Sequence, residues 1–285
     1  MSEALKEKPT AGEADFRGAR DQANSPAPRA SPSQYSVILL PLAVGLLFLA
    51  AWHFAVKFSG SDIFPTPWQV VQGLGELAQQ GLLLKYIVAS LFRVSWGFAL
   101  AVFLGVPLGL LLGWFSPAFS ALNPFIQILR PISPIAWIPV AILWFGVKDT
   151  APVFLIFLAS VFPITVSATA AVQNMQPVYL RAAQNFGLSR VELFRRVIFP
   201  SCLPQIITGL RIALGIAWLV VVAAEMIAVN SGLGYLIIDA RNAGKRYDLV
   251  VAGMVMIGLI GLVLDLLIRR LETFDEVRWG YANRR

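Results

Sequence analysis

Six runs of apolar residues limit the fold of this chain more than any other feature. They lie near 37–56, 90–114, 132–147, 150–172, 204–228 and 249–268. A helix needs ~20 residues to cross the hydrocarbon core of a bilayer, and inside lipid every backbone polar group must be satisfied within the segment. Apolar residues make up 57% of the chain and charged residues 14%, whereas about 25% of a soluble domain is charged. The sequence therefore predicts an all-α membrane protein with six transmembrane helices.

The segments around these runs have a different composition. Residues 1–36 mix Pro, Ala, Ser and Gly with charges of both signs, and such a segment cannot bury enough apolar surface to offset the entropy of ordering. We expect a disordered cytoplasmic tail there, followed by a transmembrane domain over 37–285. Between the first two runs, residues 68–84 are weakly amphipathic and follow a Pro-rich turn, so we expect them at the membrane interface.

The distribution of Lys and Arg predicts the orientation, because these residues resist translocation across the inner membrane. With the N-terminus inside, the residues on the inner side are Lys6, Lys8, Arg17, Arg20, Arg29, Arg130, Arg181, Arg190, Arg195, Arg196, Arg269, Arg270, Arg278, Arg284 and Arg285. Those on the outer side are Lys57, Lys85, Lys148, Arg241, Lys245 and Arg246. The count favours a multi-pass protein of the bacterial inner membrane with both termini in the cytoplasm.

The outer segment 229–247 is more basic than this rule favours. Its three cations, Arg241, Lys245 and Arg246, are consistent with a vestibule that concentrates an anion, or with a surface that meets lipid headgroups. Asp239 and Asp248 lie among these cations and weaken the first interpretation.

Several functions are disfavoured by what the sequence lacks. The net charge is +7, yet no basic stretch is interleaved with aromatics as in nucleic-acid-binding domains. Cys202 and His53 are the only residues of their kinds, so a cysteine metal cluster or an intrachain disulfide cannot form. With one His, one Cys and scattered acids, no nucleophile, metal cluster or acid pair forms a catalytic constellation at membrane depth, and no G-x-x-x-x-G-K-[ST] loop is present. We therefore expect no catalytic residue, no metal and no cofactor on this chain, and no nucleic-acid partner.

The segment between the fourth and fifth runs, residues 176–204, has clear helix signals. Pro177 suits the first position of a helix over 178–186, and Gly187 stands where a left-handed residue ends a helix. Ser189 and Glu192 form a capping-box pattern.

A second helix is therefore expected to run to Arg196. Pro200 and Pro204 are expected to mark the turn back into the membrane.

The same segment resembles the EAA loop of bacterial ABC importer permeases. The matching residues are Ala182, Ala183, Gly187, Val197, Phe199 and Pro200. The resemblance implies a coupling helix that docks on a separate ATPase subunit, to which ATP binds. Arg181 departs from the family, which usually has an acidic residue there, so an ion pair made by that acid is not expected here. A juxtamembrane hairpin without a partner is the alternative interpretation.

The resemblance covers roughly residues 65–272. Within it, 127–146, 209–226 and 230–237 are similar to the nitrate, sulfonate, taurine and bicarbonate branch of the family. It implies the type I (MetI-like) permease fold, a second permease copy, a periplasmic or lipid-anchored binding protein, and import of a small anion. An ion-gradient-driven secondary carrier is the alternative, although the inverted repeats typical of such carriers are not visible.

Ionisable residues inside a span are expensive and need a reason. Those in the predicted spans are Arg93, Arg211, Glu225 and Asp265. At ~100° and ~1.5 Å per residue, Arg211 and Glu225 lie about 40° apart around one helix and about 21 Å apart along it. With Trp218 between them they are candidates for the transport path, or for pairing with another helix near the interfaces. For Asp265 we expect an ion pair with Arg269 at the helix end.

Overall fold

The computed structural model describes residues 34–60 and 63–271. The chain divides into two compact units, residues 1–55 and 56–285. Helix α2 (Gln34–Ser59) begins at Gln34, inside the segment expected to be a disordered tail, and the rest of that tail lies outside the described residues. The stretch Leu39–Ser59 of α2 is long and apolar enough to cross a bilayer, in agreement with the first predicted run.

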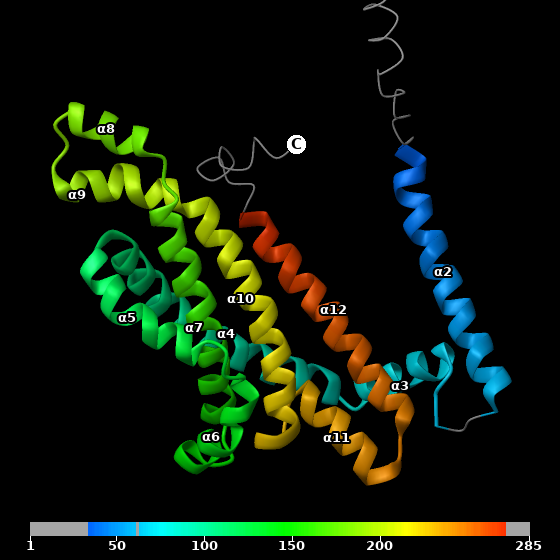
Figure 1. Ribbon diagram of the computed structural model, residues 1–285. Coiled ribbons are helices and arrows are strands. Elements are labelled where there is room, and N and C mark those ends of the chain that lie inside the picture. The colour runs from blue at the N-terminus through cyan, green and yellow to red at the C-terminus, as the bar shows by residue number, and fades with distance from the viewer. Residues whose placement is uncertain (1–33, 61–62, 272–285) are drawn as a thin grey trace, which may run out of the picture. The chain divides into compact units, whose positions relative to one another are not determined.

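The second unit consists of helices joined by short connections (Figure 1). They are α3 (Pro67–Gln79), α4 (Leu82–Trp114), α5 (Ser116–Leu129), the 3₁₀ turn η1 (Pro134–Trp137), α6 (Ile138–Phe145), α7 (Thr150–Gln173), α8 (Pro177–Asn185), α9 (Arg190–Leu193), the π-helical turn η2 (Phe194–Ile198), α10 (Phe199–Ala228), α11 (Leu233–Gly244) and α12 (Tyr247–Leu271). In Figure 1, α8 and α9 lie at one end of this unit, whereas α6 and α11 lie at the other end.

Five helices among the described residues are long and apolar enough to cross a membrane. A sixth crossing is present if α5 and the η1–α6 segment count as one span, which is bent by 83°. The third predicted run, 132–147, is therefore only the second half of a broken element, and α5 occupies residues expected to be a loop. Pro131 lacks the N–H group that would continue the helix, and Pro134 disfavours helical geometry at Ser133, whose ψ is 127°.

Two other boundaries differ from the expectation. The second spanning helix begins at Leu82 rather than near residue 90, directly after Gly81, whose φ is 69°. The interfacial segment 68–84 is thus shortened to α3, which starts with a Thr66–Gln69 capping box. The outer segment 229–247 is not a simple loop, since it contains α11, whose Leu233 and Leu236 are buried.

Helices α4 and α7 pack closely through a row of small residues. The row, at every fourth position of α4, comprises Gly97, Ala101, Gly105, Gly109 and Gly113. A Cβ atom at Gly97 would lie 2.7 Å from Cβ of Ile156, and one at Gly109 would lie 2.5 Å from the Thr165 carbonyl oxygen. Small residues repeated at this spacing let two membrane helices approach backbone to backbone. The α4–α7 pair therefore forms a closely packed centre against which α10 also packs.

Candidate functional site

The α8–α9 hairpin has the local structure that its sequence predicts. Pro177 occupies the first turn of α8, and Gly187 has a φ of 68°. After the helix, the Leu188 amide donates to the Ala183 carbonyl at 3.3 Å. Ser189 and Glu192 form the expected capping box at the start of α9. These contacts fix a tight turn, which carries the chain back antiparallel toward the membrane-spanning helices.

The connection from α9 to α10 differs from the prediction. Residues 194–198 form a π-helical turn, and the helical path is continuous from Arg190 to Ala228. Pro200 lies in the first turn of α10 and Pro204 lies inside it, so neither marks a break in the helix. The helical path continues although Pro200 lacks an amide donor, because the π-helical turn directly before it already departs from the regular α-helical hydrogen-bond pattern. Helix α9 is therefore joined to α10 through helical backbone, without an intervening loop.

The inner face of the hairpin is packed. Ala183 is buried in one apolar cluster with Leu193, Ile198 and Cys202. Val197, in the π-helical turn, packs at the edge of the same cluster. This packing holds α8 on the end of the α7–α10 pair.

The outer face of α8 is apolar and open. Val178 is 59% exposed and Phe186 is 83% exposed, and Ala182 lies exposed between them at helical spacing. Arg181 is also exposed, beside this row. Large apolar side chains exposed on an otherwise polar segment, Val178 on α8 and Phe186 at its C-terminal cap, indicate a protein-binding surface. We call Val178, Ala182 and Phe186 the docking row.

The two alanines of the sequence motif thus have different surroundings. Ala182 belongs to the docking row, and Ala183 belongs to the core beneath it. Phe199 is partly exposed at the start of α10, beside the half-buried Pro200. The structure brings these motif residues together at one end of the molecule, where the sequence placed them.

A buried charge network lies toward the opposite end. Arg93 on α4 is 1% exposed and Glu225 on α10 is 0% exposed. Nη1 of Arg93 lies 2.6 Å from Oε1 of Glu225, and Nη2 lies 2.6 Å from Oδ1 of Asp149. Nη1 also donates to the carbonyl of Ser231 at 2.8 Å. One guanidinium group therefore joins α4, α10, the start of α7 and the segment before α11.

Glu225 receives further hydrogen bonds. Its Oε2 accepts from the Ser90 hydroxyl at 2.8 Å and from the Gly234 amide at 3.0 Å. A Cβ atom at Gly232, whose φ is 106°, would collide with this carboxylate. The sequence identified Arg93 and Glu225 as ionisable residues inside predicted spans, but it did not predict that they form an ion pair. The glycines at 232 and 234 were the available signal, because a side chain at 232 would collide with the carboxylate and one at 234 would collide with the Val222 carbonyl of α10.

The candidate path residues on α10 contact neighbouring helices. Arg211 donates to Asp265 on α12, with Nε–Oδ1 at 2.7 Å and Nη2–Oδ2 at 2.9 Å. The predicted pairing of Asp265 with Arg269 is thus replaced by an interhelical, bidentate ion pair. Trp218 is almost buried, and its Nε1 donates to the Ile257 carbonyl at 3.0 Å. Assignment of Arg211, Trp218 and Glu225 to a path stays a prediction, but their contacts match the alternative of pairing between helices.

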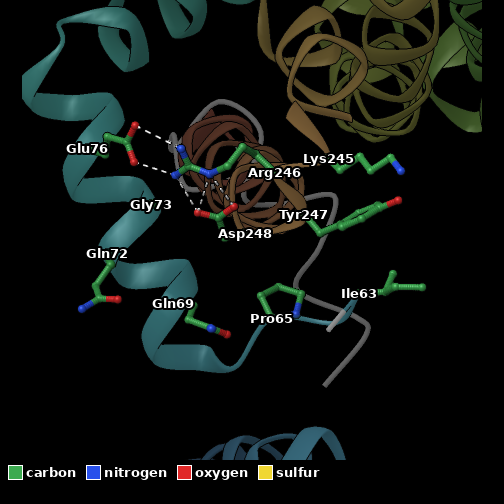
Figure 2. A pocket seen from close by; sticks show the side chains of 10 residues that line it. All are labelled: Ile63, Pro65, Gln69, Gln72, Gly73, Glu76, Lys245, Arg246, Tyr247 and Asp248. Carbon is green, nitrogen blue, oxygen red and sulfur yellow. Dashed lines mark hydrogen bonds and ion pairs between the residues drawn. The ribbon is translucent and has the colours of Figure 1, made fainter. Parts of the chain in front are cut away.

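The basic segment near α11 is partly neutralised. Arg246 lies between two carboxylates, 2.6 Å from Glu76 and 2.8 Å from Asp248 (Figure 2). The hydrogen bond from Arg246 lowers the pKa of Glu76, and the two carboxylates raise the pKa of Arg246. Lys245 extends away from this cluster beside a cavity of about 300 Å³. Of the three cations expected to attract an anion, only Arg241 and Lys245 lie exposed.

Comparison with known proteins identifies relatives over most of the chain. Residues 105–274 match the family described as "Binding-protein-dependent transport system inner membrane component". The taurine transport system permease protein TauC of Escherichia coli (strain K12) is 37% identical over 85% of this chain and 90% of its own length. The nitrate import permease protein NrtB of Leptolyngbya laminosa is 36% identical over 84% of this chain and 91% of its own length.

A solved structure supports the fold independently. The inward-facing MetNI methionine ABC transporter matches with a TM-score of 0.59 and 17% identity, over 68% of this chain and 96% of the matched chain. At this identity the likeness concerns the fold alone. It confirms the all-α, MetI-like permease fold that the sequence predicted.

Proposed function

The chain belongs to the family of binding-protein-dependent transport system inner membrane components, and we propose that it carries a small anion into the cell in a complex energised by a separate ATPase. The resemblance drawn from the sequence is thereby confirmed, and the chain is a multi-pass permease subunit of an ABC transporter. The ion-gradient-driven carrier is not supported by these relatives.

The docking row is the observation that carries the proposal of a separate ATPase. Val178, Ala182 and Phe186 present apolar surface to a partner, and Ala183 fixes the same helix to the core. The continuous helix from Arg190 to Ala228 then gives a direct mechanical route from that partner into the membrane. ATP would bind to the partner, because this sequence contains no phosphate-binding loop.

The remaining parts of the complex follow from orientation and family. The excess of Lys and Arg on the side of α8 and α9 supports a cytoplasmic position for the hairpin and for both termini. A second permease copy would complete the pathway in the inner membrane. A periplasmic or lipid-anchored binding protein would deliver the substrate to the end that holds α6 and α11. Membrane lipids surround the apolar outer surface.

The substrate class is inferred from the relatives. Their names specify taurine and nitrate, and both compounds carry an oxyanion group. We therefore propose nitrate, bicarbonate or a sulfonate such as taurine as the transported solute.

Uptake into vesicles tests this function directly. The permease, its ATPase and its binding protein would be reconstituted together, and uptake of nitrate, bicarbonate and taurine measured with and without ATP. We expect ATP-dependent uptake of one of these anions that persists when an ionophore collapses the ion gradients. Uptake that needs a gradient and no ATP would support a carrier instead, and transport of a cation alone would contradict the anion assignment.

A further inference from the structure

Polar residues form a stripe on the otherwise apolar helix α5. The stripe consists of Asn123 and Gln127 on the helix and of Arg130, the residue directly after its last residue, Leu129. At ~100° per residue they fall within an arc of about 60°, so they share one face of the helix. Polar and ionisable side chains at membrane depth are costly and commonly mark a pathway for ions or substrates.

Arg130 lies beside a cavity of about 310 Å³. The cavity is also lined by Trp137, by Phe162 near the middle of α7, and by Ile212 near the middle of α10. Arg130 was expected in a cytoplasmic loop, and the structure places it instead level with the middle of two spanning helices. Among the described residues, no ion pair or side-chain hydrogen bond engages its guanidinium group. A cation without a protein partner therefore faces a space large enough for a small ligand.

A second cavity of about 190 Å³ extends the stripe toward the α8–α9 hairpin. It is lined by Asn123 and Gln127 on α5 and by Thr169 and Gln173 on α7. Gln173 is the last residue of α7, close to the start of the hairpin. Side-chain amides offer N–H donors to an anion without binding it as strongly as a charge. The two cavities place a cation at mid-depth and weaker donors between it and the hairpin end.

The break after α5 makes this position suitable for binding. The α5 and η1–α6 segments meet at 83°, at the residues that follow Leu129. Transporters commonly bind their substrate near the middle of the membrane where a helix is interrupted. A guanidinium group presents parallel N–H donors that match the oxygens of nitrate, carboxylates and sulfonates.

We propose that Arg130 binds the transported oxyanion midway across the membrane, and that Asn123 and Gln127 line its route to the hairpin end. This inference rests on the proposed import of an anion. It adds a path candidate outside α10, where Arg211 and Glu225 already bond to neighbouring helices.

The route can be tested without knowing the substrate. In the complete transporter, with Cys202 changed to Ala, single cysteines would replace Asn123 or Gln127, and a cysteine at Ile128 would serve as the matched control. Ile128 is 68% exposed but lies about 140° from Asn123 around the same helix. We expect a membrane-impermeant anionic thiosulfonate to label positions 123 and 127 at least about tenfold faster than position 128. Equal labelling at all three positions would overturn the route.

Arg130 itself is tested by transport. Arg130→Gln should lower ATP-driven uptake of nitrate, bicarbonate or taurine about tenfold or more, while Arg130→Lys should retain an intermediate rate because it keeps the charge. Stimulation of the ATPase by the loaded binding protein should persist in both variants, whereas a purely structural defect would abolish it. Wild-type uptake by Arg130→Gln would overturn the assignment, as would occupation of the site by a lipid phosphate alone.

The labelling and transport experiments together distinguish failure of this inference from failure of the proposed function. If the wild-type complex imports none of the three anions, the proposed substrate class and the role of Arg130 both fail, and the labelling pattern still decides the route. If an anion is imported but Arg130→Gln is unaffected, only the role of Arg130 fails.

Discussion

Replacing Arg93 by methionine removes the centre of the buried charge network but keeps a side chain of similar length. The change leaves Glu225, which is fully buried, with two hydrogen-bond donors, the Ser90 hydroxyl and the Gly234 amide. Removing one partner of a buried ion pair destabilises a protein by about 3–5 kcal/mol, because the other charge stays desolvated. We expect Arg93→Met to lower the free energy of unfolding by about that amount.

Glu225→Gln should cost less. Arg93 would keep its contacts with Asp149 and Ser231, so a loss of about 1–3 kcal/mol is expected for the changed hydrogen bonds. In the double variant neither charge of the pair remains. Its loss in the free energy of unfolding should therefore be smaller than the sum of the two single-variant losses by about 1–3 kcal/mol.

Unfolding of the purified permease in detergent, followed by helical signal during denaturant titration, measures these differences. Arg93→Lys is the matched control, and it should fall between wild type and Arg93→Met because it keeps the charge and loses the fork of donors. Additive single losses, or a wild-type stability for Arg93→Met, would refute the account of this network.

Three further predictions concern the hairpin and the Glu76 cluster. Gly187→Val should strain the turn by about 1–2 kcal/mol, because φ is positive there, and should uncouple ATP hydrolysis from uptake. Gly187→Asn should reduce uptake less, and normal uptake by the Val variant would contradict the role of this turn. Ala183→Leu should overpack the core beneath α8, which costs about 1–3 kcal/mol of stability and lowers the thermal midpoint of unfolding. Ala182→Leu should leave the midpoint unchanged and weaken ATPase binding. Equal midpoints for the two variants would contradict the assignment of Ala183 to the core and Ala182 to the surface. Arg246 lowers the pKa of Glu76 from its ordinary 4.5, so the stabilisation by this carboxylate is present above pH 4.5 and is lost as the pH falls through the lowered pKa. The stability advantage of wild type over Glu76→Gln should therefore vanish in acid. An advantage that is constant with pH would disprove the ion pair.

Local signals in the sequence predicted the hairpin well. Pro177, Gly187 and the Ser189–Glu192 pair each act through contacts within a few residues, so their effect does not depend on the rest of the fold. The continuous path through η2 into α10 was missed because Pro200 and Pro204 were expected to end a helix, whereas both lie within the path from Arg190 to Ala228. Tertiary contacts, and not local preference, decide between these two outcomes.

Pairings across long sequence separations could not be predicted in this way. The sequence marked Arg93 and Glu225 as costly, but their contact joins residues on different helices and depends on how α4 and α10 pack. The same reason explains the pairing of Arg211 with Asp265. The position of Arg130 was missed because a broken helix was interpreted as a loop followed by a span.

The proposed connection between α8 and an ATPase depends on the docking row and can be tested at Phe186. The measurement is co-purification of the ATPase with the permease from membranes, together with ATP-driven uptake, for Phe186→Ser and the apolar control Phe186→Leu. Phe186 is 83% exposed, so neither change should affect folding. We expect the Ser variant to lose most of the bound ATPase and of the uptake, while the Leu variant keeps both. Full ATPase binding and uptake in Phe186→Ser would contradict the proposed connection.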